Sequence, residues 1–547
     1  MKKLTFLVCI IFTASLFSCG NDDRGDGSGH MYDVSILGNP QSLDPQYATD
    51  SASNTIIKNL YSGLMTTDSN GNIMCCNAES YTISPDGLEY TFTLRQDNYW
   101  FFDKNDNDFI DDDEYFPVTA KDYVFAFRRI LDPSMQSPYA ADFSCIRNGS
   151  NIIADKALPE TAGVIAVDDY TLNISLDYPC AEFLGLLATN ASCPCNREFF
   201  YSTKGRYGLD DRSVMSNGSF FVRQWFYDPY GVNNILYMKK NSVNSNEENE
   251  IIPSFLSFTI ESDENDIRNM FRVGDIECFT TENIDGINTK KNIITSSCAT
   301  TLGLIFNSYD EYFSCLSMRK ALTLSMDRGK ILDDSETDIT IAYGVIPPAV
   351  NLLGRSYREL VSDKQYEFYN ILQAEKCLAV AQAELGVEEP AYFEDIKILV
   401  SAGTVNTDYL NRLSQQWYDA LGVYVGIDEV TQSEFNRRIA EKDYSIALYP
   451  LKAKYNSGLS VIEQFDGNEC LEYSVNGKKL TDEIRKCSDV SELVECYCKQ
   501  ESQILDGYGF VPVFYKNSYL VMSNDNEDIF YDAFTGAVDF RIAKNYS

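Results

Sequence analysis

"PVTAKDYVFAFRRILDPSMQSPYA", residues 117–140, contains a complete signal for the start of a helix. Thr119 is placed to cap the helix, and Asp122 follows three residues later, which is the spacing of a capping box. Apolar residues then recur at helical spacing as far as Leu131. The stretch therefore predicts an amphipathic helix over residues 119–131 with one buried face.

Strand-like and helix-like runs alternate along the rest of the chain. Strands are predicted at 32–37 and 88–95, and further helices at 314–332, 407–423 and 433–443. This alternation predicts an α/β fold. A chain of 547 residues is too long for one hydrophobic core, so about two to four domains are expected.

The charge and the histidine content exclude several classes of function. The formal net charge is −36, which repels phosphate backbones, so no nucleic-acid partner is expected. His30 is the single histidine, and it lies in a polar segment. The commonest general base and metal ligand is therefore missing, and no hydrolase motif is evident. The sequence predicts a protein that is not an enzyme.

The first 19 residues have the pattern of an export signal. Lys2 and Lys3 precede a short apolar run, which is too short to span a bilayer by itself. Leu16 to Cys19 resemble the lipobox of bacterial lipoproteins, which implies that Cys19 is lipidated. The alternative, an internal apolar helix, is disfavoured by the Gly/Asp/Ser tether that follows at once, over residues 20–31. We expect an extracytoplasmic protein anchored to the cell membrane by lipid.

Fourteen cysteines follow Cys19. Cys193 and Cys195, like Cys496 and Cys498, are spaced as metal-binding or redox pairs could be. No histidine lies near them, so we interpret these cysteines as thiols or disulfides.

Several further blocks follow in a characteristic order. They are residues 38–73, 78–100, 117–140, 216–225, 270–279, 318–332, 509–517 and 532–540. In this order they resemble the bacterial extracellular solute-binding proteins of family five, the peptide-binding subunits of ABC importers. The resemblance covers nearly the whole chain after the tether.

The resemblance implies a two-lobed, periplasmic-binding-protein-like fold of type II, cluster C, with hinge strands and an additional inserted lobe. The boundaries that we expect are lobe I at 32–48, 185–300 and 508–547, the inserted lobe at 49–184, and the opposite lobe at 301–507. It also implies that an oligopeptide or related small solute binds between the lobes and passes to a permease and ATPase complex. The alternative is a surface peptide or pheromone receptor, or a chaperone, that uses the same cleft without import.

Two groups of ligand-binding residues near the start of the chain are implied by the resemblance. It places Asn39, Pro40 and Gln41 in the cleft, although Asn-Pro is also a plain turn signal. It also places Tyr139 where relatives present a tyrosine to the ligand backbone, and a packed aromatic residue is the alternative.

The stretch 444–458 departs from the family pattern. Relatives usually have Gly-Trp-x-Ala-Asp-Tyr here, and the Asp binds the terminal ammonium of the peptide. This chain has Leu451 in place of the Trp and Lys454 in place of the Asp. Either Lys454 meets an acidic group of the ligand, or another acid of the protein binds the ammonium. The residues expected to contact the ligand in this stretch are Leu448, Pro450, Leu451, Lys452 and Lys454.

An acidic loop, DKNDNDFIDDDE at 103–114, interrupts the family pattern. Its spacing matches an EF-hand loop, except that Asp108 stands where Gly is expected. The alternative is a solvated acidic excursion. We predict a structural Ca²⁺ and no other cofactor, with ligands from Asp103, Asn105, Asn107, the Phe109 carbonyl, Asp111 and Glu114.

Overall fold

A computed structural model describes residues 29–546, apart from 69–70, 108–109, 232, 247–248, 333–337, 353, 362–368, 391–392, 394, 469, 472–478 and 488. The predicted signal peptide, Cys19 and most of the tether lie outside the described residues. In the described part of the chain, no helix is both long and apolar enough to cross a bilayer.

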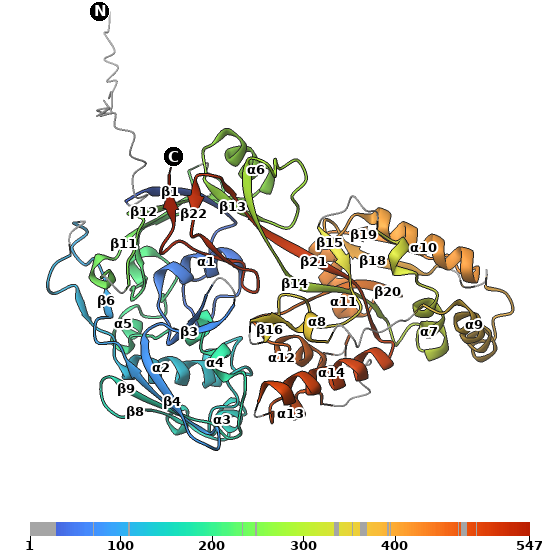
Figure 1. Ribbon diagram of the computed structural model, residues 1–547, viewed down its shortest axis with the longest axis horizontal. Coiled ribbons are helices and arrows are strands. Elements are labelled where there is room, and N and C mark those ends of the chain that lie inside the picture. The colour runs from blue at the N-terminus through green and yellow to red at the C-terminus, as the bar shows by residue number, and fades with distance from the viewer. Residues whose placement is uncertain are drawn as a thin grey trace, which may run out of the picture.

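Two bodies are linked by two long strands (Figure 1). These crossing strands are β14 (Asn292–Phe306) and β21 (Phe510–Ser523), which pair antiparallel along most of their length. They lie inside an eleven-stranded mixed sheet of the described residues, in the order β10-β11-β12-β1-β13-β21-β14-β20-β18-β19, with β15 paired to β21. The two-lobed α/β fold predicted from the sequence is confirmed.

Lobe I forms one end of this sheet. Its elements are β1 (Met31–Leu37), α1 (Ser51–Leu60), β10 (Phe220–Phe226), β11 (Ile235–Lys240), β12 (Phe255–Glu261), α6 (Glu264–Val273), β13 (Cys278–Thr281), β22 (Asn526–Glu527), β23 (Phe530–Asp532), β24 (Ala537–Asp539) and β25 (Lys544–Asn545). β1 pairs parallel with β12 and β13 in the middle of this end.

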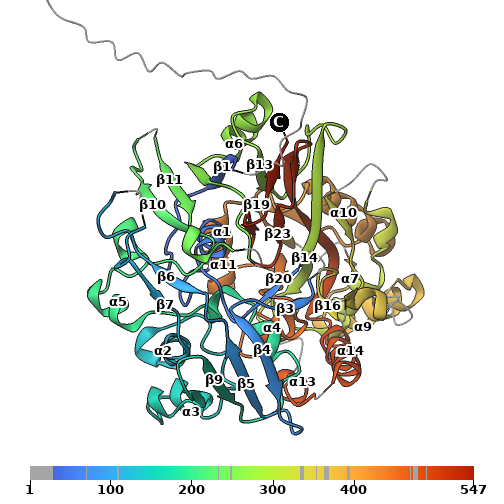
Figure 2. The ribbon, with the colours of Figure 1, turned by 60° about the vertical axis from the view of Figure 1, so that its left-hand side comes forward.

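The inserted lobe lies between α1 and β10 in the chain. It contains β2 (Met65–Thr67), β3 (Ile73–Cys75), β4 (Ala78–Ile83), β5 (Glu89–Leu94), β6 (Tyr99–Phe101), β7 (Tyr115–Pro117), α2 (Ala120–Leu131), α3 (Gly149–Ile153), β8 (Val164–Ala166), β9 (Thr171–Ser175), α4 (Phe183–Leu186) and α5 (Arg197–Ser202). Its sheet has the order β4-β5-β9-β8, and α2 packs on β8 and β9 (Figure 2).

The capped helix predicted at 119–131 is present as α2. The Asp122 carboxylate accepts hydrogen bonds from the Thr119 N–H at 2.8 Å and from the Thr119 hydroxyl at 3.1 Å. Tyr123, Phe127, Ile130 and Leu131 of α2 are buried in a core that is continuous with lobe I. The predicted segment therefore anchors the inserted lobe to the rest of the molecule.

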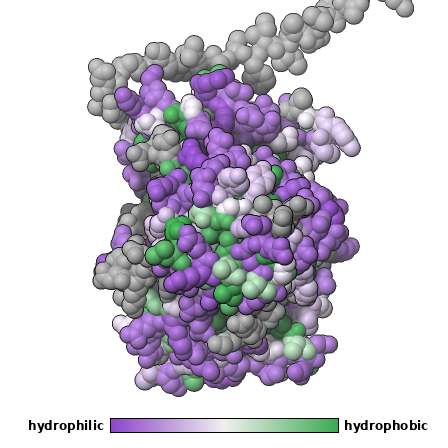
Figure 3. Space-filling view, turned by 90° about the vertical axis from the view of Figure 1, so that its right-hand side faces the viewer, coloured by the Kyte–Doolittle hydropathy of each residue, from purple (hydrophilic) through white to green (hydrophobic). Residues whose placement is uncertain are grey.

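Lobe II, residues 307–507, forms the other end of the large sheet. Its elements are α7 (Leu316–Leu324), β15 (Ile339–Ile341), β16 (Asn351–Leu352), β17 (Arg355–Ser356), α8 (Tyr357–Leu360), α9 (Ile371–Leu385), β18 (Lys397–Ser401), α10 (Thr407–Leu421), β19 (Gly426–Val430), α11 (Gln432–Glu441), β20 (Ile446–Lys452), α12 (Leu459–Ile462), α13 (Thr481–Ile484) and α14 (Val490–Asp506). Its outward face is mostly hydrophilic (Figure 3).

The crossing strands contribute side chains to both lobes. In β14, Ile293 packs on the core of lobe I, whereas Leu302 and Leu304 are buried in lobe II. In β21, Leu520 is buried in the core of lobe I, and Val513 is buried in lobe II. Between these ends the strands carry mostly polar residues, and the buried apolar cluster found there is small, formed by Cys298, Ala342 and Tyr515.

The structure refines the expected boundaries. The predicted boundary at residue 300 falls within β14, because this strand belongs to both lobes. Helix α1, which the prediction placed in the inserted lobe, contacts β10 and β24 of lobe I. The predicted strands and helices at 32–37, 88–95, 407–423 and 433–443 correspond to β1, β5, α10 and α11. The segment predicted as one helix at 314–332 is α7 followed by a short 3₁₀ turn.

A buried ion pair joins α2 to the loop that follows β1. Arg129 binds Asp44 at 2.5 Å and donates to Gln46 Oε1 at 2.7 Å. Only 6% of the Arg129 side chain and 10% of the Asp44 side chain are exposed. The guanidinium also stacks over the Phe200 ring at 4.1 Å. Removal of one partner would leave the other charge buried and unpaired.

We predict that Arg129→Met lowers the free energy of unfolding by about 3–5 kcal/mol, because Asp44 loses its buried counter-charge. Urea denaturation followed by circular dichroism measures the change.

The matched control is Lys121→Met in the same helix. Lys121 forms an ion pair with Asp169 at 2.7 Å in which both side chains are more than half exposed, so its loss should change stability by less than about 1 kcal/mol. Equal losses in the two variants would contradict the role given to the buried pair.

Candidate functional site

Two cavities lie between lobe I and lobe II, next to the crossing strands. Cavity 1 has a volume of about 830 Å³, and cavity 2 has a volume of about 560 Å³. Lys516 and Ser518 of β21 line cavity 1, whereas Thr295 and Ser297 of β14 line cavity 2. Tyr531 of β23 lines both. The polar middle of the crossing therefore forms a wall of each cavity.

The walls of cavity 1 come from both lobes. Lobe I contributes residues 280–283, Glu264 and Asp285, and lobe II contributes residues 403–407, Asp338 and Glu429. Of the charged residues on these walls, five are acids and two, Lys452 and Lys516, are bases.

One of these bases is already paired. Lys516 forms an ion pair with Glu282 at 2.6 Å, and only 12% of its side chain is exposed. Glu264 is likewise paired, with Arg268 at 2.8 Å. The other wall charges are Asp285 on lobe I, Asp338 and Glu429 on lobe II, and Lys452, and the Asp338 carboxylate accepts a hydrogen bond from the Tyr519 hydroxyl. Cavity 1 thus has an excess of negative charge.

Cavity 2 is also polar and acidic. Its walls include Lys58, Asp68, Asp528, Asp532 and Asp539 on the side of lobe I and the inserted lobe. Ala349, Asn351, Tyr455 and Asn456 form the wall on the side of lobe II. A solute in either cavity would contact both lobes at once.

The family model of the bacterial extracellular solute-binding proteins, family 5 (middle), matches residues 76–470. The chain belongs to this family. The resemblance seen in the sequence is therefore confirmed, and the two cavities lie between the lobes of a solute-binding protein.

Similar proteins cover nearly all of this solute-binding protein. The oligopeptide-binding protein OppA of Bacillus subtilis is 23% identical over 567 residues, which cover 99% of each chain. The oligopeptide-binding protein AliB of Streptococcus pneumoniae is 26% identical, over 81% of this chain and 75% of its own. The solved structure of Listeria monocytogenes OppA bound to peptide matches with a TM-score of 0.70 and 21% identity, over 95% of this chain and 99% of that chain. The last match supports the fold.

The predicted residues near the start of the chain lie beside the cavities. Asn39 Oδ1 accepts a hydrogen bond from Trp225 Nε1 at 2.9 Å, Pro40 is buried, and the Gln41 N–H donates to Ser53. None of the three lines cavity 1 or cavity 2, whereas their neighbours Ile36, Leu37 and residues 51–52 do line cavity 1.

Tyr139 packs within the protein. Its hydroxyl donates a hydrogen bond to the Ala48 carbonyl, and its ring lies against the core of lobe I and the inserted lobe. Burial raises the pKa of Tyr139 to about 12. These contacts favour the packed-aromatic alternative over a contact with ligand.

The predicted residues of strand β20 and the loop after it divide into core and surface. Leu448 and Leu451 are fully buried in the cores of lobe II, and Pro450 is exposed. Lys452 lines cavity 1. Lys454 lies outside both cavities and forms an ion pair with Glu463 at 3.1 Å.

The acidic loop is organised by hydrogen bonds within the loop. The Glu114 carboxylate accepts from the N–H groups of Lys104 and Asn105 at 2.8 and 3.0 Å. The Asp111 carboxylate accepts from the side-chain amides of Asn105 and Asn107 at 2.9 and 3.0 Å.

The loop does not present a formed metal site in the part that the structure describes. Asp103 Oδ1 accepts from the Asp106 N–H, and Asp103 Oδ2 is buried without a hydrogen-bond partner. Phe109, a predicted carbonyl ligand, lies outside the described residues. Among the described residues, no group of three or more His, Cys, Asp or Glu side chains is placed to hold a metal ion. Calcium binding therefore stays a prediction.

The sequence analysis missed most of the cavity walls. Lys516, Glu282 and Asp338 meet around cavity 1 from three distant segments, and nothing in their local sequence marks them as neighbours. The only signal was the polar middle of β14 and β21, which interrupts two otherwise apolar strands. Cys193 and Cys195, like Cys496 and Cys498, are thiols that form no disulfide with each other in the described part of the chain.

We predict that Tyr139→Phe lowers the free energy of unfolding by about 1 kcal/mol, because the hydrogen bond to Ala48 is lost. Ligand affinity should stay unchanged, since Tyr139 lines neither cavity. Urea denaturation and calorimetric binding of the same variant separate the two effects. A loss of affinity with unchanged stability would support the ligand-contact alternative instead.

Proposed function

We propose that this protein is the substrate-binding protein of an ABC importer that captures an oligopeptide and delivers it to a membrane permease and its ATPase. The family membership and the printed names of the similar proteins, which are oligopeptide-binding, support the proposal. These relatives match over most of their own length, so the whole binding protein is compared.

The observation that carries the proposal is the origin of the cavity walls. Each cavity is lined by both lobes and by the strands that connect them. A solute that contacts both walls binds the closed arrangement more tightly than the open one, so its binding energy shifts the equilibrium towards closure. Closure is then the structural signal that a permease could recognise.

The charges of cavity 1 favour a cationic ligand. Asp285 faces the cavity from lobe I, and Asp338 and Glu429 face it from lobe II. Like charges on opposite walls repel as the lobes approach, and a ligand ammonium or guanidinium between them would relieve this repulsion. Lys452 is left to attract a carboxylate of the same ligand. A peptide with a basic side chain fits this arrangement.

We also propose that the protein acts outside the cytoplasm, anchored through a lipid on Cys19, and that it has no catalytic role. The extracellular family and the export signal support the location. The single histidine, His30, contacts Glu277 at 3.1 Å and lines neither cavity, which supports a binding role without general-base chemistry.

Native mass spectrometry of the purified protein tests the function. We expect an added mass that corresponds to one or more peptides, and calorimetric binding of synthetic peptides of two to six residues to the stripped protein. Absence of binding by every peptide, together with binding of a sugar or other non-peptide solute, would contradict the proposal.

The charge preference is tested with two tripeptides that differ in one side chain. Alanyl-lysyl-alanine should bind more tightly than alanyl-glutamyl-alanine. Asp338→Asn and Glu429→Gln should each weaken binding of the lysine peptide by about twofold to fivefold, because each removes one wall charge.

The matched control is Glu389→Gln, at an exposed residue of the same lobe that lines neither cavity. It should leave both affinities unchanged. Equal affinity of the wild type for the two peptides would refute the charge preference while leaving peptide binding intact.

A further inference from the structure

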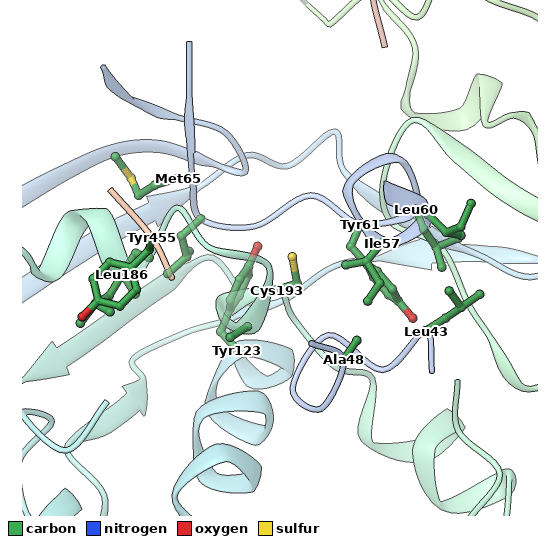
Figure 4. Close-up of a cluster of buried hydrophobic side chains, with 14 of the residues drawn as sticks. Leu43, Ala48, Ile57, Leu60, Tyr61, Met65, Tyr123, Leu186, Cys193 and Tyr455 are labelled. Carbon is green, nitrogen blue, oxygen red and sulfur yellow. The ribbon is translucent and has the colours of Figure 1, made fainter. Parts of the chain in front are cut away.

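The lobes also touch beside cavity 2, between the inserted lobe and helices α12–α14 of lobe II. The Tyr497 hydroxyl of α14 donates a hydrogen bond to the carboxylate of Glu182, the residue that precedes α4 of the inserted lobe. Tyr455, in the loop after β20, is only 6% exposed and packs within the core shared by lobe I and the inserted lobe, near Leu186 (Figure 4). We call this contact the interlobe latch.

Five charged side chains meet in the interlobe latch. Asp142 and Glu182 come from the inserted lobe, and Lys454, Glu463 and Arg485 come from lobe II. Lys454 and Arg485 lie 3.1 and 3.9 Å from the Glu463 carboxylate. Three carboxyl groups therefore share two cations at a partly buried contact, in which the Glu463 side chain is 10% exposed and the Lys454 side chain is half exposed.

Glu182 Oε2 is buried at this contact and has no hydrogen-bond partner among the described residues. A buried carboxylate oxygen without a partner is costly when the group is ionised and less costly when it is protonated. Contact between the lobes therefore favours the protonated form of Glu182.

Burial raises the pKa values of both carboxyl groups of the inserted lobe. Burial, and then the neighbouring Glu463, raises the pKa of Asp142 to about 7. Burial also raises the pKa of Glu182 to about 7. When the lobes separate, both groups face water and return towards their ordinary pKa values near 4.

We propose that contact between the lobes is coupled to proton uptake, with Asp142 and Glu182 protonated in the interlobe latch and ionised when it opens. If the protein captures a solute as proposed above, the consequence is tighter capture at acidic pH and easier release at alkaline pH. Only this consequence rests on the proposed function. The latch itself involves no ligand.

The direction in which pH shifts the opening of the latch follows from proton linkage. The closed form binds more protons than the open form between about pH 4 and pH 7, so rising pH in this window favours opening. For each of the two groups, the closure equilibrium constant falls by at most about tenfold per pH unit. Above about pH 8 both forms are ionised and the dependence ends.

Besides Lys454, Arg485 and Glu463, the ionisable groups that interact with Asp142 or Glu182 are Tyr139, Tyr455, Tyr497 and Cys487. Tyr178, Cys145 and Cys180 lie around Arg485 and Tyr455. Burial raises the pKa of Tyr178 and of Cys487 to about 12, and it raises the pKa values of Tyr455 and Tyr497 still further. The Cys180 contact and burial raise the pKa of Cys145. The phenols and the Cys145 and Cys487 thiols therefore stay neutral across the window.

Small-angle X-ray scattering of the ligand-free protein from pH 5 to pH 8.5 tests the latch. We expect the radius of gyration to rise with pH in the wild type. The double variant Asp142→Asn, Glu182→Gln should stay compact throughout, because the two amides reproduce the protonated forms without titrating. Glu160→Gln, an exposed position of the inserted lobe, is the matched control and should behave as the wild type.

Tyr497→Phe provides a second test, since it removes the hydroxyl that binds Glu182 and adds no charge. It should shift the scattering towards the open form at pH 5.5, with circular dichroism confirming an intact fold. Scattering of the wild type that does not change with pH, or a double variant that keeps the wild-type pH dependence, would overturn the proposal. Peptide binding that persists in either case would leave the proposed function standing.

Discussion

The pairing of β14 with β21 is the constraint on which the rest of the structure depends. The two strands pair from Asn292 with Ser523 in lobe I to Ile305 with Phe510 in lobe II. Their ends are fixed because each end contributes side chains to a separate core, and their polar middle is held mainly by the backbone ladder, which is interrupted between Ser297 and Thr300. Such a connection holds two lobes at a fixed spacing while it allows them to rotate. The cavities, the wall charges and the interlobe latch all lie where that rotation would open or close a gap.

Much of the fold could be predicted because its signals are local. The cap formed by Thr119 and Asp122 lies within one turn of chain, and the alternation of 88–95 reports which face of β5 is buried. The order of the blocks then identified the family and its two lobes. The lobe boundaries were less accurate, because β14 belongs to both lobes and α1 packs on lobe I. A division of the chain into ranges cannot express a strand that is shared by two cores.

The candidate site was harder to predict, because its residues are neighbours only in space. Lys516 and Glu282 are separated by more than two hundred residues and form an ion pair at 2.6 Å in a wall of cavity 1. Lys454 stood out in the sequence as a departure from the family pattern, but no local signal indicated that its partners would be Glu463 and the half-buried Asp142. The resemblance indicated the right strand, β20, and Lys452 at its end reaches the cavity. It could not separate Lys452 from Leu448 and Leu451, which fill the cores of lobe II.

The central claim is that one solute binds to both lobes at once. Hydrogen exchange measured by mass spectrometry, with and without the solute that copurifies or a peptide that binds, tests it most directly. The account predicts that bound solute slows exchange together in residues 280–285 of lobe I and 403–407 of lobe II, which face each other across cavity 1, or in the two walls of cavity 2. Protection confined to one lobe, or found only away from both cavities, would contradict the account.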